Sequence, residues 1–344
     1  MNELCIRDLT DLTGGTLHLG AMPPLAGAME PLGEIRLQHD TIERGDVYWP
    51  RPSEDHAAEM YAEAAYMQGA AGVVITHRSL EPWAGTFCLQ VDDPHKAMLR
   101  FASAMRQQFC GSVISLLSDE QELLGALCHT FLRERMQGSW SDTPVADPMD
   151  IAFKIAGLVA SDEYTLLAQP FLSHSQKDGF SHLCSPDVAV ITRTAMTEIN
   201  PVANERQVQQ ATREALKRLP ENGLVIVNAT DAVLQDAARV SNAQVISIAS
   251  DCGKSAVATL QATSDAISFE ISHASFHVPS AANIRWETVA AAVTLGRELG
   301  ISMTSMQAAW RTFQKQRTMA ADRALSSPAN SKPTSEPNKT TKAA

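Results

Sequence analysis

A short polar stretch follows a run of apolar residues one third of the way along the chain. Ser118, Asp119, Glu120, Gln121 and Glu122 stand directly after "SVISLL" and directly before "LLGALCHTFL". A turn between a buried strand and a helix is a place where backbone N–H groups can bind a phosphate. Phosphate-binding turns use glycines and a lysine, and this one contains neither. Its carboxylates would repel a phosphate, whereas in a first helical turn they interact favourably with the helix dipole.

Two other stretches could in principle bind an ion. His273 and His277 are four residues apart in "SHASFHVPS", and on a strand they would share one face, but no carboxylate or cysteine stands beside them. The segment Gly253–Ser255, "GKS", follows a strand, but Ile248 stands where a phosphate loop requires glycine. The residues after it alternate as a strand, so no helix would begin at the phosphate. We therefore expect neither a metal site nor a second phosphate site.

Apolar strands that alternate with amphipathic helices must position these residues. Asp92 or Asp93 can cap one of the helices, whose first turn contains Pro94. Alternation of this kind predicts an α/β fold with a mostly parallel sheet that is covered on both faces. The expected strands are 72–76, 86–91, 112–117, 164–169, 188–192, 223–228 and 243–249, and the expected helices are 55–70, 93–109, 120–136, 148–158, 203–219 and 231–240.

The pattern divides the chain into three parts. Residues 1–110 are predicted to form an N-terminal α/β domain, and residues 111–322 a central domain. In the central domain, short alternating strands at 257–262 and 266–278 precede two helices at 286–299 and 303–316. Residues 323–344 are rich in Ser, Pro, Thr, Asn and Lys without periodicity, which predicts a disordered tail.

Composition excludes several classes of partner. The chain has 344 residues, 44% of them hydrophobic, and a formal net charge of -11. Because Lys and Arg nowhere gather into a long patch, we expect no nucleic acid and no anionic membrane as partner. The start "MNELCIRDLTDLTGG" lacks the basic and apolar regions of a signal peptide, so the sequence predicts a cytoplasmic protein.

Three stretches resemble the Mur ligases. "HDTIERGDVYWPRPSEDHAAEMYAEAAYMQGAAGVVITH", residues 39–77, resembles the uridine-nucleotide-binding domain at the N-terminus of that family. "SPDVAVITRTAMTEI" resembles a strand of its central ATPase domain, and "VAAAVTLGRELGIS" resembles its last central helices. The resemblance runs in order over about residues 1–316 and is strongest to the branch that adds a D-alanyl-D-alanine dipeptide.

The resemblance implies ATP-driven amide formation, together with the residues that should carry it. The family's phosphate loop, T-G-S-x-G-K-T, corresponds to Leu117–Leu123, with Ser118 and Gln121 at glycine positions and Glu122 at the lysine position. We therefore expect a P-loop-NTPase-like central domain without a functional P-loop, no catalytic residues, and no ATP or Mg²⁺ at the family site. The family's third domain, which positions the amino substrate, is also expected to be missing.

The N-terminal domain keeps more of the family pattern. The resemblance assigns Asp40, Thr41, Asp46 and His56 to a UDP-sugar site, although the family's arginine is absent from that strand. The leading hypothesis is an inactive relative that acts by binding a UDP-muramoyl peptide or a cell-wall enzyme in peptidoglycan precursor metabolism. Two alternatives stay open: a working peptidoglycan ligase completed by another chain, and a structural α/β protein with no small ligand.

Overall fold

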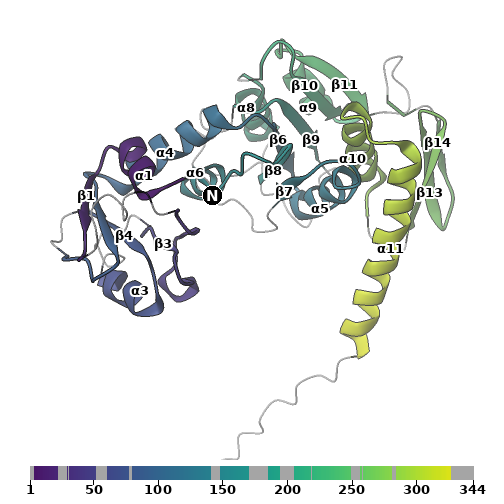
Figure 1. Ribbon diagram of the computed structural model, residues 1–344. Helices are drawn as coiled ribbons and strands as arrows, with labels where there is room; N and C mark the ends of the chain where they lie inside the picture. Colours follow the sequence, from purple (N-terminus) through teal and green to yellow (C-terminus); the bar gives the residue numbers. More distant parts are fainter. Residues whose placement is uncertain are drawn as a thin grey trace, which may run out of the picture.

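The computed structural model contains three sheets arranged in two lobes (Figure 1). It describes residues 4–21, 29, 31–51, 60–76, 80–140, 148–169, 185–193, 205–217, 219–248, 256–257, 259–280 and 284–326.

The N-terminal lobe is a five-stranded sheet with the order β1-β5-β4-β3-β2. The four strands β2 to β5 run parallel, and β1 pairs with β5 in the antiparallel sense. Asp93 caps α4 by accepting hydrogen bonds from the N–H groups of His95 and Lys96, so it is the second of the two candidate caps that is used. The elements are α1 (Ile6–Thr13), β1 (Thr16–Leu19), β2 (Ile35–Arg36), η1 (His39–Thr41), β3 (Val47–Tyr48), α3 (Ala62–Gln68), β4 (Gly72–Ile75), β5 (Phe87–Gln90) and α4 (Pro94–Gln108).

The central lobe is built on a six-stranded sheet with the order β11-β10-β9-β6-β8-β7, and every neighbouring pair is parallel. The predicted α/β fold with a mostly parallel central sheet is therefore confirmed. Its elements are β6 (Ser112–Ser118), α5 (Gln121–Leu132), β7 (Gly138–Trp140), α6 (Pro148–Ala156), β8 (Tyr164–Gln169), β9 (Val188–Thr192), α8 (Glu205–Leu216), β10 (Leu224–Asn228), α9 (Ala232–Ala238) and β11 (Gln244–Ile248).

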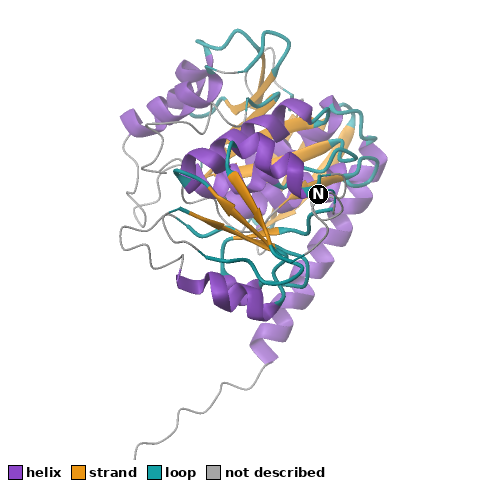
Figure 2. Ribbon diagram, turned by 60° about the vertical axis from the view of Figure 1, so that its left-hand side comes forward, coloured by secondary structure: helices purple, strands orange, loops and turns teal. Residues whose placement is uncertain are grey.

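Helices cover both faces of the central sheet (Figure 2). Leu116 and Val190 point to the face that packs against α5 and α10, whereas Leu117 and Ile191 point to the face that packs against α8 and α9. Neighbouring residues of a strand point to opposite faces, so a strand with both faces covered is apolar throughout. This is why the sequence of β9, "VAVIT", has no polar alternation.

A smaller antiparallel sheet and two helices complete the central lobe. Its order is β12-β13-β14, with β12 (Thr259–Ala262), β13 (Ala266–Ile271) and β14 (Ala274–Pro279), and the helices are α10 (Trp286–Glu298) and α11 (Met303–Ser326). The stretch 266–278 is a hairpin and not one strand, because Ser272 and His273 turn the chain with positive φ angles of 49° and 64°. The expected tail also needs correction: α11 continues to Ser326, so residues 323–326 are helical. Residues 327–344 lie outside the described residues.

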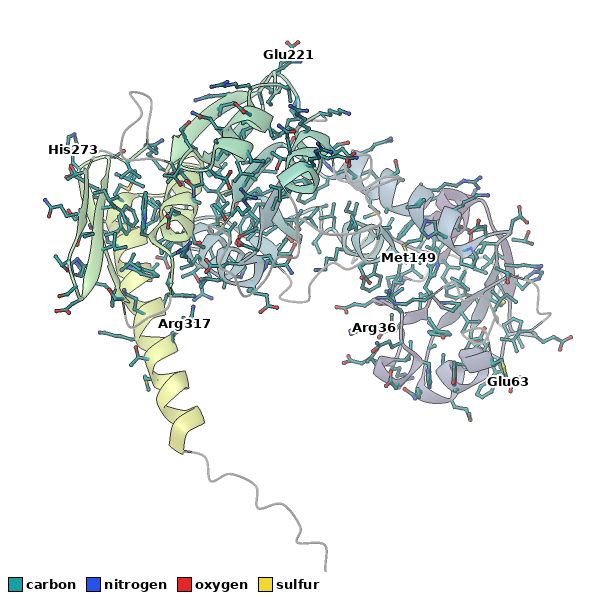
Figure 3. The ribbon with its side chains drawn as sticks, turned by 180° about the vertical axis from the view of Figure 1, so that it is seen from behind. Arg36, Glu63, Met149, Glu221, His273 and Arg317 are labelled. Atoms are coloured by element: carbon teal, nitrogen blue, oxygen red, sulfur yellow. The ribbon has the colours of Figure 1, made fainter. Side chains whose placement is uncertain are left out.

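The two lobes share a hydrophobic core. Phe101 and Met105 of α4 belong to the same buried cluster as Ile151 and Ile155 of α6. Met149, at the start of α6, lies where the two lobes meet (Figure 3). Within the described part of the chain, no helix has both the length and the apolar character that a bilayer span requires.

Candidate functional site

The polar stretch 118–122 lies at the carboxyl end of β6, in the interior of the central sheet. The predicted order of strand, turn and helix is confirmed: β6 ends at Ser118 and α5 begins at Gln121. Only Asp119 and Glu120 connect them. In open α/β sheets, ligands bind outside the carboxyl ends of the strands, so this is the correct edge for a binding site.

The Ser118 side chain is hydrogen-bonded to the backbone of the turn and to the neighbouring strand. It is fully buried, and its Oγ accepts a hydrogen bond of 3.0 Å from the backbone N–H of Glu120. It also accepts one of 3.0 Å from Oγ1 of Thr192, the paired residue on β9. The N–H of Glu120 is one of the groups that a phosphate at the helix start would need. In this structure the Glu120 N–H donates to the Ser118 side chain instead.

Glu120 connects the turn to α10, which lies 168 positions later in the chain. Its Oε2 accepts a hydrogen bond of 2.7 Å from Oγ1 of Thr288, whose side chain is buried. Burial raises the pKa of the Glu120 carboxyl above its ordinary value, and the Thr288 hydrogen bond opposes that shift. The nearby carboxylates of Asp119 and Glu287 add to the rise, whereas Arg285 lowers the pKa.

Two of the remaining residues of the polar stretch add negative charge at the surface. Asp119 and Glu122 are exposed, and Oε1 of Gln121 is buried with no hydrogen-bond partner among the described residues. Two like charges about 4 Å apart repel by about 4 kcal/mol at an effective dielectric constant of 20. A polyphosphate at this turn would lie beside the carboxylates of Asp119, Glu120 and Glu122.

Arg193 is a site residue that the sequence analysis did not single out. It follows β9 directly, and its Nε lies 2.5 Å from Oδ2 of Asp231. Asp231 also caps α9 by accepting from the N–H groups of Val233 and Leu234. The two ionic side chains are 12% and 10% exposed, so the pair is largely buried. The signal in the sequence was an arginine placed directly after a predicted buried strand.

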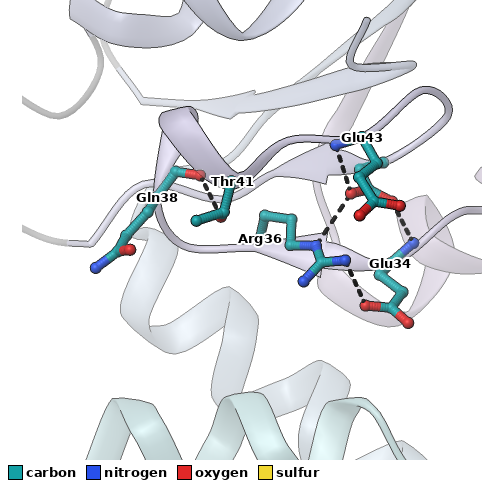
Figure 4. A network of polar contacts seen from close by, with 6 residues as sticks. Glu34, Arg36, Gln38, Thr41 and Glu43 are labelled. Atoms are coloured by element: carbon teal, nitrogen blue, oxygen red, sulfur yellow. Dashed lines mark hydrogen bonds and ion pairs between the residues drawn. The ribbon is translucent and has the colours of Figure 1, made fainter. Parts of the chain in front are cut away.

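In the N-terminal lobe, the four proposed UDP-sugar residues have different surroundings. Asp46 is buried and accepts hydrogen bonds from the N–H groups of Glu34 (3.0 Å) and Glu43 (2.9 Å) and from Nε of Arg36 (3.0 Å) (Figure 4). Asp46 therefore fixes the chain between β2 and β3.

Asp40 and Thr41 lie together in η1 and are exposed. Oγ1 of Thr41 donates to the carbonyl oxygen of Gln38 over 3.0 Å (Figure 4). The neighbouring His39 ring stacks on Tyr61, with ring centroids 4.1 Å apart. His56 lies outside the described residues. The structure thus brings Asp40 and Thr41 together on one exposed turn and commits Asp46 to the fold.

The two candidate histidines contact different partners. His273 lies in the turn between β13 and β14, with Nδ1 3.6 Å from Oε1 of Glu270 (Figure 3). Nδ1 of His277 on β14 lies 2.5 Å from Oγ of Ser268. Among the described residues, no group of three or more His, Cys, Asp or Glu side chains could hold a metal ion. The segment Gly253–Ser255 lies outside the described residues.

The sequence is similar to one curated enzyme. It is 21% identical over 201 residues to the UDP-N-acetylmuramoyl-tripeptide--D-alanyl-D-alanine ligase of Bacillus subtilis strain 168. The match covers 57% of this chain and 43% of that enzyme, so the chain corresponds to less than half of this relative's length. No family model matches the sequence.

Solved structures share the fold. MurF from Acinetobacter baumannii superimposes with a TM-score of 0.67 at 16% identity, over 89% of this chain and 67% of that one. MurF ligase from Thermotoga maritima, solved in complex with ADP, superimposes with a TM-score of 0.60 at 13% identity, over 80% of this chain and 65% of that one. These likenesses concern the N-terminal and central lobes together.

Proposed function

We propose that this chain, which is similar to the Mur ligases in sequence and fold, acts in peptidoglycan precursor metabolism by binding, without ATP-driven ligation. Its ligand would be a UDP-muramoyl peptide or an authentic cell-wall enzyme. The observation that carries the proposal is the turn at the carboxyl end of β6, where Glu120 hydrogen-bonds Thr288 and Ser118 occupies the Glu120 N–H.

The electrostatics of this turn support the loss of ligation. Phosphoryl transfer needs positive charge and free backbone N–H groups around the transferred phosphate. This turn supplies Asp119, Glu120 and Glu122, and the guanidinium of Arg193, which follows the next strand, is paired with Asp231. A nucleotide would have to displace the contact between Glu120 and α10 and would then lie beside the carboxylates of Asp119 and Glu122.

The N-terminal lobe supports the binding role. Asp40 and Thr41 stay exposed on η1, where a hydroxyl and a carboxylate can hydrogen-bond a uracil or a sugar. The ion pair between Asp46 and Arg36, together with the hydrogen bond from the Glu43 N–H to Asp46, fixes the turn that follows η1. A site that presents polar side chains on a fixed turn needs little reorganisation to bind.

Titration calorimetry on the full chain tests both parts of the proposal. We expect UDP-N-acetylmuramoyl-tripeptide to bind and ATP with Mg²⁺ at millimolar concentration not to bind. Thr41→Val should weaken UDP-muramoyl binding, and Thr10→Val, which changes a hydroxyl on α1 of the same lobe, should leave it unchanged. Binding of ATP would contradict the loss of ligation and favour a ligase completed by another chain. Binding of neither ligand would favour a structural protein or a protein partner.

A single lysine should not restore nucleotide binding. Glu122→Lys supplies the charge that the family has at this position, but Ser118 still occupies the Glu120 N–H and Gln121 still replaces a glycine. We expect no heat of ATP binding in this variant up to millimolar concentration. Measurable ATP affinity in Glu122→Lys would show that the geometry of the turn tolerates phosphate and that charge alone excluded it.

A further inference from the structure

A cavity of about 500 Å³ lies at the opposite edge of the central sheet from the turn just described. Gln108 and Phe109, which line it, come shortly before the start of β6 at Ser112. Leu158 and Ser161, which also line it, come shortly before the start of β8 at Tyr164. Because β6 and β8 are parallel, these residues share the amino-terminal edge of the sheet. The cavity is therefore separate from the proposed function.

Three elements from both lobes build this cavity. Helix α1 contributes Asp8, Asp11 and Leu12, the end of α4 contributes Met105 and the residues after it, and the segment between α6 and β8 forms the third wall. Its volume falls within the roughly 300–1,000 Å³ of small-molecule sites, and such sites often lie between domains. The walls combine apolar side chains with a few polar groups, as ligand sites do.

The charged side chains that line the cavity have one sign. None of the described residues that line it is Lys, Arg or His, and two are aspartates. Helix α4 ends at Gln108 and α6 ends at Ala156, so two helices direct the negative ends of their dipoles toward this region. Of the nearby cations, Arg106 donates to Asp187. Arg7 lies 3.8 Å from the cavity's own Asp11 in an exposed pair, so an ammonium group at Asp11 would replace Arg7 as its partner.

The donor set fits an organic cation better than a metal ion. Oδ2 of Asp8 already accepts the N–H of Cys5 over 2.9 Å. The Cys5 side chain, followed by this N–H, lowers the pKa of Asp8, so the carboxylate is charged. Asp11 is the second carboxylate, and the side chains of Leu4, Leu12 and Phe109 supply apolar surface. A divalent metal requires more oxygen ligands than this.

We propose that this cavity binds a small primary amine, with its ammonium group near Asp8 and Asp11 and its apolar body against Leu12 and Phe109. Hexylamine is a suitable probe, and hexan-1-ol is its neutral counterpart of nearly equal size. Ligand-observed NMR and calorimetry on the full chain measure both dissociation constants at low salt. The hydrogen bonds of an ammonium group to carboxylates should make hexylamine bind about tenfold more tightly than hexan-1-ol.

Three variants locate the site. Asp11→Asn should weaken hexylamine binding by roughly threefold, which is a typical size for an exposed charge pair, and should leave hexan-1-ol unchanged. Asp236→Asn, which removes an exposed aspartate from α9, is the matched control and should change neither constant. Ala160→Trp places a large side chain at an exposed position of the wall and should abolish binding of both probes.

The inference is overturned if hexylamine shows no saturable binding at millimolar concentration, or if it binds no more tightly than hexan-1-ol. It is also overturned if Ala160→Trp leaves hexylamine binding intact, because the amine would then bind elsewhere. The experiment requires neither a UDP-muramoyl peptide nor ATP, so its outcome is independent of the proposed function.

Discussion

Glu120 has two opposing effects at the level of single residues. Its carboxylate joins the start of α5 to α10 through Thr288, but burial makes the charged form costly. Nearby Asp119 and Glu287 increase that cost. A carboxyl group whose pKa is higher in the folded than in the unfolded chain stabilises the fold when it is protonated.

Replacing Glu120 with glutamine should therefore reveal a pH-dependent stability. Glu120→Gln keeps an oxygen that accepts from Thr288 and removes the buried charge. The folded-state pKa is raised, so the contribution of Glu120 is fully present below its ordinary value of 4.5 and is lost as pH rises through the raised value. We expect a higher Tm than wild type at pH 7.5, with the difference disappearing toward pH 4. Glu122→Gln, in the same helical turn but exposed, controls for the helix dipole. An equal Tm difference at both pH values would contradict this assignment.

The buried ion pair between Arg193 and Asp231 should matter more for stability than exposed pairs. Arg193→Ala leaves Asp231 largely buried without its cation, and losing one partner of a buried pair costs about 3 kcal/mol. Arg239→Ala breaks an exposed pair with Asp236, for which about 0.5 kcal/mol is expected. Urea unfolding of both variants measures the two costs. Similar costs for both would mean that water reaches Arg193.

At the level of elements, most of the central lobe could be predicted from the sequence. Strands β8 and β9 lie where their mostly apolar runs predict them, because burial on both faces leaves a strong signal. The short strand β7 was missed, since its three residues include an exposed serine and no alternation. The hairpin at Ser272–His273 was missed because its left-handed residues are neither glycine nor asparagine.

The candidate site was predictable in part for similar reasons. The position of the turn after β6 was predicted from residue types alone, because polar residues follow an apolar run there. Its lack of glycine and lysine distinguished it from a phosphate-binding turn. The contact between Glu120 and Thr288 spans 168 positions, and no local pattern predicts it. The structural role of Asp46 is likewise set by its partners, which are Glu34 directly before β2, Arg36 on β2 and Glu43 in the turn before β3.

Helix α5 packs closely against β7 at a glycine. A Cβ atom at Gly125 would lie 2.3 Å from Nε1 of Trp140, so Gly125→Ala should push the indole away and cost about 1–3 kcal/mol. Gly157→Ala is the matched control, because nothing lies closer than 3.5 Å to its added Cβ and no positive φ is required. Denaturant unfolding and Trp fluorescence should distinguish the two variants. An unchanged stability in Gly125→Ala would mean that Trp140 moves freely.

At the level of the whole molecule, the two lobes are joined by packing and by polar contacts. Helix α4 packs between the N-terminal sheet and α6, so its residues belong to a core that spans both lobes. Arg106 of α4 donates to Asp187, directly before β9, and that carboxylate also accepts the N–H of Val113. The predicted boundary near residue 110 falls between α4 and β6.

A fragment ending at residue 110 should therefore not fold alone, although it contains the complete N-terminal sheet. It would lose α6, whose Ile151 and Ile155 are buried in the same cluster as Phe101, and it would expose the apolar side of α4. Exposed apolar surface costs about 25 cal/mol per Å², so a few hundred Å² would remove most of the stability of a small domain. We expect a poorly dispersed amide NMR spectrum and no cooperative urea transition for residues 1–110, whereas the full chain should show one. A folded fragment with a sharp transition would instead mean that the lobes are independent and that the shared core contributes little.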